Sequence, residues 1–401
     1  MKFPIQISAA VALVCSALLG VSSVEAAPAY TQHIAADGVA KSLHIGLDKT
    51  GRQGASDALN GIIASLSPKG VIALDLAPGT YLIDKPVALK SNVVLRGTGD
   101  VVFRRATTVA GPGFTMFGQQ GEGLHDFGFD TIALDGNRQS DADQFSVILF
   151  NDPTNASSRF VFLDSTLRHF SRLGMGLHVK GVRDLEISNS TFADGGRGLF
   201  HSIYLLRCIN ARVVGNHISL IGGQGIKDSG QPGQDYGGLI ANNDIRGVLR
   251  GINIADFHDI VVRDNTIKDA SEAGIIVGHE SNGQSWNVTL QNNSISNSTA
   301  GISLKASRVK IIGGRLTDNA IGLHLRAAKD ITMQGVSLIN TANPGTAFVA
   351  IDDKPKPSSL DIQNSTFENR APGGRTLLIQ GRENGAITMG QSNRQLGQLQ
   401  N

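Results

Sequence analysis

Three residues that could do acid–base chemistry, His201, Tyr204 and Lys227, lie within the stretch 201–228, HSIYLLRCINARVVGNHISLIGGQGIKD. On a uronic acid polymer, β-elimination needs a cation against the carboxylate, a base that removes the C5 proton and an acid for the leaving oxygen. Lys227 suits the first or second role, His201 the second, and Tyr204 the second or third. A C5 epimerase would use similar groups and return the proton from the opposite face. The residues therefore leave elimination and epimerisation both open.

The register of the surrounding pattern decides whether these side chains share one face. If Ser202 takes the place that glycines hold in neighbouring segments, the residue two positions later points outward. Stacked strands are about 4.8 Å apart, so His178, Tyr204 and Lys227 would lie within reach of one sugar. An alternative register through Gly198 would turn Tyr204 away. In the preferred register the outward row reads His178, Tyr204, Lys227, Asn253, Ile276, Ser303 and His324.

Lengthened turns accompany this row at 193–201, 227–237 and 276–287. Long turns that cluster on neighbouring segments are typical of the walls of a binding cleft. We therefore predict a carbohydrate-binding surface formed by the row, these turns and the short turn between the later two. Its predicted substrate-binding residues are His178, Arg197, Asp228, Tyr236, Arg250, Asn253, Asp256, His258, His279, Glu280 and Trp286.

Each candidate also has an ordinary structural interpretation. A single outward Lys or Tyr is usually a solvated surface residue, and Trp286 could cover a loop instead of stacking on a sugar. Cys208 has no neighbour that marks it as a nucleophile, so we expect a small buried residue. No Cys or His cluster has metal-ligand spacing, and calcium has no motif, so no cofactor is predicted.

Two other functions stay open beside elimination and epimerisation. A glycoside hydrolase would need two carboxyl groups across the bond, which Asp228 with Asp256 or Glu280 could supply. A non-catalytic carbohydrate-binding or structural protein would need neither set.

A repeat of short strands must position these residues. Eight six-residue segments begin and end with an apolar residue, and their last residues are 21 to 29 positions apart. Most are followed by a Gly and a further apolar triplet. One repeat per 20 to 30 residues leaves no room for crossover helices, so we predict an all-β solenoid of stacked coils. The third residue of each segment is of a type that tolerates a left-handed backbone, as a tight turn between two short strands requires. These residues are Asn189, Gly215, Asn242, Asp264, Asn292, Gly313, Gly335 and Asn364.

The ends of the chain suggest further divisions. Lys2, the apolar run 9–21 and the small residues before Ala26 predict a signal peptide over 1–26, and hence a secreted or periplasmic protein. We expect a leading segment with a capping helix over 27–70, stacked coils over 71–382 and a tail over 383–401. The capping helix should start near Ser56-Asp57, with one of these two side chains as its cap.

Composition narrows the partners. The net charge is +2 with 17% charged residues, which gives no basic stripe for nucleic acid. No later segment resembles a membrane span. We expect a polysaccharide partner and a monomer.

The chain resembles a right-handed parallel β-helix of the pectate-lyase-like superfamily. The Asn turn positions resemble that family's asparagine ladder, and Pro78-Gly79-Thr80-Tyr81 with SNVVLRGTG at 91–99 is similar to the usual N-terminal coils. The resemblance implies the fold but no single activity, since the superfamily holds lyases, hydrolases, epimerases and phage adhesins. The polygalacturonase motifs (NTD, DD, GHG, RIK) are absent except for Asp352-Asp353, as are the pectate lyase signatures and the DPHD of periplasmic alginate epimerases.

Overall fold

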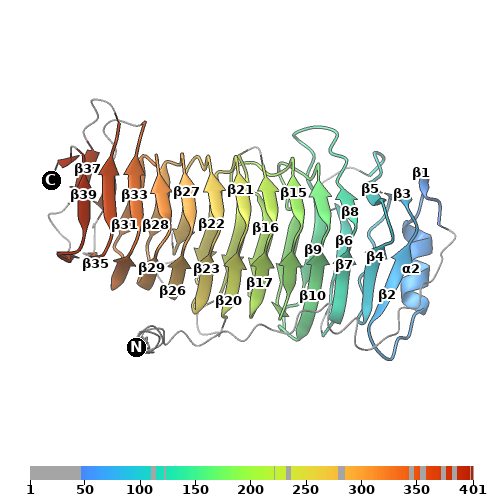
Figure 1. Ribbon diagram of the computed structural model, residues 1–401. Coiled ribbons are helices and arrows are strands. Elements are labelled where there is room, and N and C mark those ends of the chain that lie inside the picture. Colours follow the sequence, from blue (N-terminus) through green and yellow to red (C-terminus); the bar gives the residue numbers. More distant parts are fainter. Residues whose placement is uncertain are drawn as a thin grey trace, which may run out of the picture. The chain divides into compact units, whose positions relative to one another are not determined.

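The computed structural model describes residues 47–109, 114–121, 123–220, 222–231, 236–278, 285–342, 347–352, 358–371, 376–381, 386–397 and 399–400. All of them belong to one compact unit, residues 40–401. Three long parallel sheets account for almost all of its regular structure, as predicted (Figure 1). His279, Glu280 and the predicted signal peptide lie outside the described residues.

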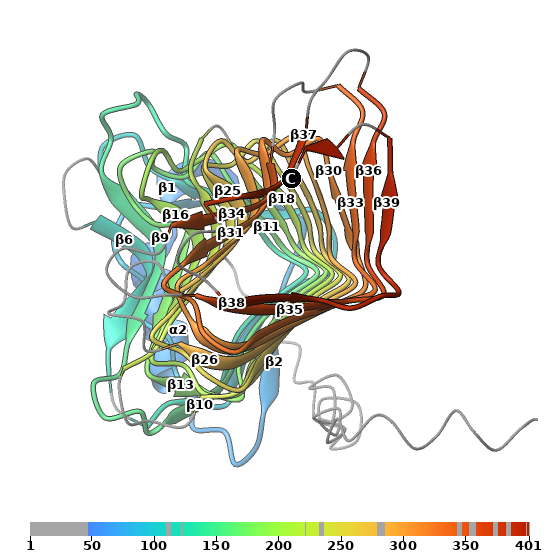
Figure 2. The ribbon, with the colours of Figure 1, turned by 90° about the vertical axis from the view of Figure 1, so that its left-hand side faces the viewer.

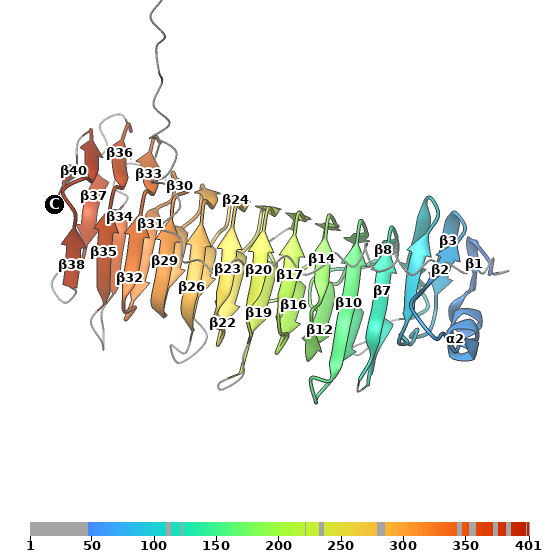
Figure 3. The same cartoon turned by 60° about the horizontal axis from the view of Figure 1, so that its bottom comes forward.

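Each coil contributes one strand to each sheet, which we name A, B and C. In the coil that starts at β19, the chain passes from sheet C to sheet B at β20 and to sheet A at β21, and then returns to sheet C at β22. Figure 2 looks along the stack and shows the three sheets as the sides of the coil. Figure 3 shows the strands in sequence order along the stack, as the pairings require.

Sheet A consists of β1 (Thr50–Gly54), β3 (Gly79–Ile83), β5 (Val101–Arg105), β8 (Ala133–Asp135), β11 (Thr166–Arg168), β15 (Thr191–Ala193), β18 (His217–Ser219), β21 (Asp244–Arg246), β24 (Thr266–Lys268), β27 (Ser294–Ser296), β30 (Arg315–Thr317), β33 (Ser337–Asn340), β36 (Thr366–Asn369) and β39 (Arg394–Leu396). Sheet B consists of β2 (Ile72–Leu76), β4 (Val93–Gly97), β7 (His125–Asp130), β10 (Ser157–Leu163), β13 (Val182–Arg183), β14 (Glu186–Ser188), β17 (Ala211–Val214), β20 (Gly238–Ala241), β23 (Ile260–Arg263), β26 (Trp286–Gln291), β29 (Ser307–Ile312), β32 (Ile331–Gln334), β35 (Ser359–Gln363) and β38 (Ala386–Met389). Sheet C consists of β6 (Phe114–Gln120), β9 (Phe145–Asn151), β12 (Leu177–Lys180), β16 (His201–Leu206), β19 (Gln224–Ser229), β22 (Arg250–Ala255), β25 (Ala273–Val277), β28 (Ala300–Leu304), β31 (Ile321–Arg326), β34 (Ala347–Asp352), β37 (Thr376–Gln380) and β40 (Leu399–Gln400).

The stack extends beyond both predicted boundaries. β1 already pairs with β3 before residue 71, and β38, β39 and β40 add one strand to each sheet after residue 382. The segment expected to be a separate tail therefore continues the coils.

The helix α2 (Ser56–Ser65) covers the first coils with Leu59 and Ile63, which are buried. The expected side-chain cap is wrong, because Ala55 is the N-cap residue and makes no side-chain hydrogen bond. The Ser56 hydroxyl instead accepts hydrogen bonds from the backbone N–H groups of Asp84 and Lys85, which ties the helix to the chain after β3.

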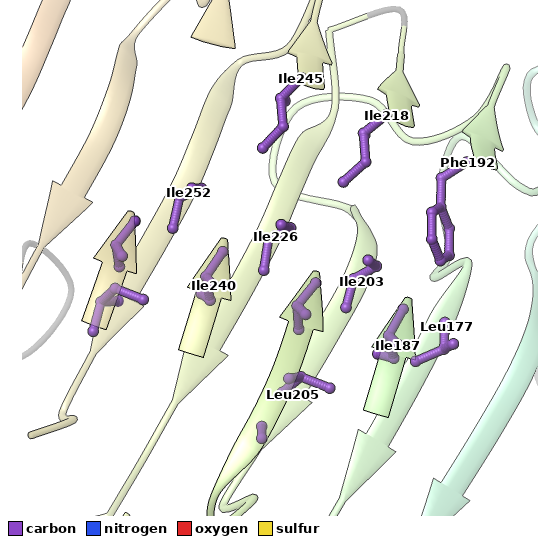
Figure 4. Packing of buried hydrophobic residues seen from close by; sticks show 14 of the residues in the cluster. Leu177, Ile187, Phe192, Ile203, Leu205, Ile218, Ile226, Ile240, Ile245 and Ile252 are labelled. Carbon is purple, nitrogen blue, oxygen red and sulfur yellow. The ribbon is translucent and has the colours of Figure 1, made fainter. Parts of the chain in front are cut away.

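The core is a set of aliphatic columns inside the coils. Ile203, Ile226 and Ile252 stack from sheet C, because each pairs with the next along the stack. Figure 4 shows them facing residues of the other two sheets such as Ile240 and Ile245. Near the N-terminal end the interior is filled by phenylalanines, for example Phe117 against Phe129 with ring centroids 5.0 Å apart. The burial of such side chains supplies most of the driving force for folding.

The turns between sheets B and A carry the predicted left-handed residues. All eight have positive φ angles, between 49° at Asn189 and 70° at Gly215. The asparagine ladder lies one residue later than expected. The side chain of Asn216 donates to Oδ1 of Asn243 at 3.0 Å, and Asn243 donates to Asn265 at 2.9 Å in the next coil. These amides are buried and hydrogen-bonded, so they hold the turns in register.

Candidate functional site

The outer face of sheet C carries the predicted row of side chains. Tyr204 pairs with His178 on one side and with Lys227 on the other, and Lys227 pairs with Asn253. The pairing continues through Ile276 and Ser303. The register with Ser202 at the glycine position is therefore confirmed, and the alternative through Gly198 is wrong.

A second outward row runs beside the first and was not predicted. It contains His201, Gln224 and Arg250, which pair with one another along the stack. Its side chains contact the first row, since the Asn253 amide donates a hydrogen bond to Oε1 of Gln224 at 3.2 Å. The sequence offered one signal for this second row, namely the position that precedes the glycine of each coil. Gln224 precedes Gly225, as His201 precedes Ser202.

The ring of Tyr204 is the centre of the site. The His178 imidazole stacks on it with centroids 4.6 Å apart, and the His201 imidazole does so at 4.7 Å. The ammonium of Lys227 lies 5.4 Å from the centre of the same ring, within the range of a cation–π contact. The three predicted catalytic residues therefore meet on one surface.

Burial and charge shape this cluster. Burial and the nearby charge of Lys180 lower the pKa of His178 to about 4, so its imidazole is neutral at neutral pH. No described group makes a hydrogen bond with its Nε2 atom. His201 is buried, and its Nδ1 lies 3.2 Å from the sulfur of Met175 in the preceding coil.

Polar residues beside the cluster are buried although they lie on the outer face. Gln224, Arg250 and Asn253 are all less than 9% exposed. Arg250 forms an ion pair of 2.8 Å with Glu272, a residue that the sequence did not single out. Such fixed polar groups can orient a polar ligand because they need not reorganise when it binds.

Asp228 does not belong to this surface, which corrects its predicted role. It lies in β19 between Leu205 and Ile254 of the neighbouring coils, and its side chain points into the core. It is 1% exposed, and neither carboxyl oxygen has a hydrogen-bond partner among the described residues. Burial raises the pKa of Asp228 well above its ordinary value. The alternation of faces along β19 explains the result, since Lys227 points outward.

Tyr236 is likewise a core residue and cannot bind substrate as predicted. Its ring stacks on Phe257 with centroids 4.6 Å apart, and its hydroxyl donates to the backbone oxygen of Gln231 at 2.9 Å. It fills the corner where the chain passes from sheet C to sheet B.

The remaining predicted binding residues that the structure describes lie in or beside the turns at the corners of the coil. His258 and Trp286 stack at the corner between sheets C and B, with centroids 4.5 Å apart. Asp256 is a half-buried turn residue in that corner, with a φ of 50°. Arg197 is exposed in the turn before β16, between sheets A and C.

No group of three or more His, Cys, Asp or Glu side chains that could bind a metal occurs among the described residues. Histidine and methionine can both bind copper, but His201 and Met175 are only two groups. In the described part of the chain, no helix is long and apolar enough to cross a membrane.

The three parallel sheets form a parallel β-helix, the fold of the solved structures described below. Residues 155–344, just under half of the chain, match the family described as "Periplasmic copper-binding protein (NosD)". No protein with a curated description matches the sequence.

Several solved structures share the fold. The A-module of mannuronan C-5 epimerase AlgE6 from Azotobacter vinelandii is 18% identical, with a TM-score of 0.60 over 88% of this chain and 97% of its own. The catalytic unit of GH87 alpha-1,3-glucanase from Streptomyces thermodiastaticus is 17% identical, with a TM-score of 0.63 over 90% and 69%. The surface protein and adhesin PfbA from Streptococcus pneumoniae is 12% identical, with a TM-score of 0.57 over 89% and 98%. At these identities the similarity establishes the fold alone.

Proposed function

We propose that the protein acts on a polysaccharide that contains uronic acid, by β-elimination or C5 epimerisation, at the Tyr204 cluster. The observation that carries the proposal is the meeting of His201, Tyr204 and Lys227 on the outer face of sheet C. The neutral His178 imidazole completes the surface. A cation, an imidazole and a phenol at one place match the three groups that proton removal beside a carboxylate requires.

Lys227 binds the C6 carboxylate of the uronate in this proposal. Its ammonium neutralises the carboxylate, so that the negative charge which develops when the C5 proton leaves is stabilised. Lys227 points outward from β19 and is half-buried, which keeps its charge available to a ligand on the surface.

His201 or Tyr204 then removes the C5 proton. In elimination, the electron pair of the broken C5–H bond forms the C4–C5 double bond, the C4–O4 bond breaks, and O4 takes a proton from Tyr204. In epimerisation, the other of these two side chains instead gives its proton to C5 on the opposite face. The two rings are stacked 4.7 Å apart, so both could reach one sugar residue.

The hydrolase alternative loses support from the position of Asp228. Hydrolysis needs two carboxyl groups on either side of the bond, and the Asp228 carboxyl lies inside the coil. A non-catalytic carbohydrate-binding role stays a competitor, since a parallel β-helix is also the fold of the adhesin PfbA.

The proposal includes export to the periplasm or beyond. It rests on the N-terminal sequence pattern over 1–26 and on the match to a family described as periplasmic. Mass spectrometry of the protein recovered from its own cells should find a mature N-terminus after Ala26. Recovery of uncleaved protein from the cytoplasm would contradict this part.

Incubation with a panel of uronate polymers in D2O separates the alternatives. A lyase gives products with the ultraviolet absorbance of an unsaturated sugar, whereas an epimerase incorporates deuterium at C5 without cleaving the chain. A hydrolase gives new reducing ends with neither signal. If no polymer changes but one binds, the non-catalytic alternative is correct and the proposal is wrong.

A further inference from the structure

Trp286 lies in a column of residues at the corner between sheets C and B that the proposed reaction does not use. Along the stack, His258 pairs with Trp286, Trp286 with Ser307, and Ser307 with Lys329. The Trp286 ring is half-buried, while Lys329 is exposed. The column therefore presents an aromatic ring and a cation on the outside of two coils that are separated by the coil of Ser307.

The indole of Trp286 is held on one side by stacked rings. It stacks on the His258 imidazole, and His258 in turn contacts the ring of buried Tyr236. On the opposite side the paired residue is Ser307, whose side chain is too small to cover an indole face. A fixed, partly exposed aromatic ring is the kind of surface on which the apolar side of a pyranose packs.

Arg308 occupies an unusual backbone conformation beside this ring. Its φ is 53°, in the left-handed region, where the equivalent residues of adjacent coils are Asp259, Asn287 and Asp330. Asn and Asp tolerate this conformation, whereas an arginine pays a steric cost. Strained residues of this kind are found disproportionately at functional sites.

The charge of Arg308 acts on Asp259. Burial raises the pKa of Asp259, but hydrogen bonds from Asn287 and His258 and the charges of His258 and Arg308 lower it below its ordinary value. Asp259 follows His258, and Arg308 follows Ser307, so these two residues flank the coil of Trp286. Arg308 therefore lies one coil from Trp286, at the position that follows Ser307.

We propose that this corner binds one acidic sugar residue, with its pyranose ring on Trp286 and its carboxylate on Arg308 and Lys329. The choice of an acidic sugar rests on the proposed function, since both sites would bind the same class of polymer. The corner site uses none of the residues of the Tyr204 cluster. Asp259 is already bound by His258 and Asn287. Asp330 follows Lys329 and adds a competing negative charge, so preference for an anionic over a neutral glycan is the discriminating property.

The chain contains one tryptophan, so its fluorescence reports directly on this corner. The titration uses Tyr204→Phe protein, in which turnover is expected to be slowed, with oligogalacturonate, oligomannuronate and neutral maltohexaose as ligands. We expect a saturable fluorescence change with at least one oligouronate and an affinity at least tenfold weaker for maltohexaose.

Arg308→Asn is the decisive variant because it removes the charge and suits the left-handed backbone. It should weaken oligouronate binding about tenfold while the thermal midpoint stays equal or rises, and Lys268→Gln in sheet A should bind normally. No saturable change, equal binding of maltohexaose, or normal binding by Arg308→Asn would each overturn the corner site. If Tyr204→Phe loses no catalytic rate while this binding persists, only the catalytic assignment fails.

Discussion

His201 and Tyr204 stack on each other with ring centroids 4.7 Å apart, although they are three residues apart in β16. Residues three apart in a regular strand point to opposite faces. The regular pairing of β16 with β19 includes His201 and Ile203 but skips Ser202 and Gly225. This irregularity brings both side chains to the outer face, and it repeats in the next coil, where the pairing of β19 with β22 skips Gly225 and Gly251.

Gly225→Ala should damage this irregular position. A Cβ atom there would lie 2.5 Å from the carbonyl oxygen of Gly251 in the next coil. We expect the free energy of unfolding, measured by urea denaturation, to fall by about 1–3 kcal/mol, as overpacked sites generally do. Gly225→Ser should lose less, because a serine already occupies the equivalent position of the preceding coil. There the Ser202 hydroxyl donates a hydrogen bond to the Gly225 oxygen at 2.5 Å.

Gly61→Ala in α2 is the matched control. No atom lies within 4 Å of a Cβ built at Gly61, and alanine is the better helix former. Its free energy of unfolding should stay constant or rise by up to about 1 kcal/mol. A loss at Gly61 equal to that at Gly225 would contradict the steric explanation.

Tyr204→Phe should separate catalysis from packing. Phenylalanine keeps a ring for His178 and His201 to stack on but removes the hydroxyl. We expect kcat on the active polymer to fall by about 10²-fold or more, the usual contribution of a general acid or base.

Tyr81→Phe supplies the control for Tyr204→Phe. Tyr81 is buried in β3, and its hydroxyl donates to the backbone oxygen of Ala77 at 2.7 Å. Its loss should lower stability and leave kcat unchanged. A wild-type kcat for Tyr204→Phe would remove Tyr204 from the mechanism.

The fold could be predicted because every coil repeats the same constraints. The apolar ends of the short segments and the eight left-handed turn residues recur wherever the chain must turn. The ladder was predicted one residue too early, because Asn189 and Asn242 are themselves asparagines and lie next to the ladder positions. The phenylalanine-filled coils near Phe117 lack the regular repeat, so their packing was not visible in the sequence.

The site was harder to predict because adjacent residues of one strand face opposite sides. Lys227 and Asp228 both carry charge, and only the alternation along β19 separates the outward cation from the buried acid. Tyr236 follows a lengthened turn, and nothing in its neighbours revealed that it fills the core against Phe257. Glu272 was missed because its partner Arg250 lies in the preceding coil.

His178 should make stability depend on pH in the acid range. Its pKa is lowered from 6.5 to about 4 by burial and by the charge of Lys180. Between these two values the unfolded chain binds the extra proton, so the free energy of unfolding should fall as the pH drops through this window. The variant His178→Phe has no imidazole to protonate, so its free energy of unfolding should lack this fall. Denaturation curves of both proteins, recorded at several pH values across the window, measure the difference. An NMR titration of His178 with a midpoint near 6.5 would contradict the burial argument.

Asp228→Leu should stabilise the protein, and more so as the pH rises. The carboxyl is buried beside Leu205 and Ile254 and has no described hydrogen-bond partner, so its desolvation is uncompensated. At neutral pH we expect the free energy of unfolding to increase by about 1–3 kcal/mol, the cost of an unsatisfied buried polar group.

The pH dependence of the same site has a definite sign. The pKa of Asp228 is raised in the folded state, so the folded chain holds a proton that the unfolded chain releases above about pH 3.9. The contribution of Asp228 to stability should be fully present below this value and fall as the pH rises through the folded pKa. Burial and the Asp228 carboxyl also raise the pKa of nearby Cys208 to about 12, so its thiol stays neutral in this range. Asp228→Asn, which cannot ionise, should lose the pH dependence while keeping a polar group in the core. Parallel stability profiles for wild type and Asp228→Asn between about pH 4 and 9 would show that the carboxyl is not buried as described.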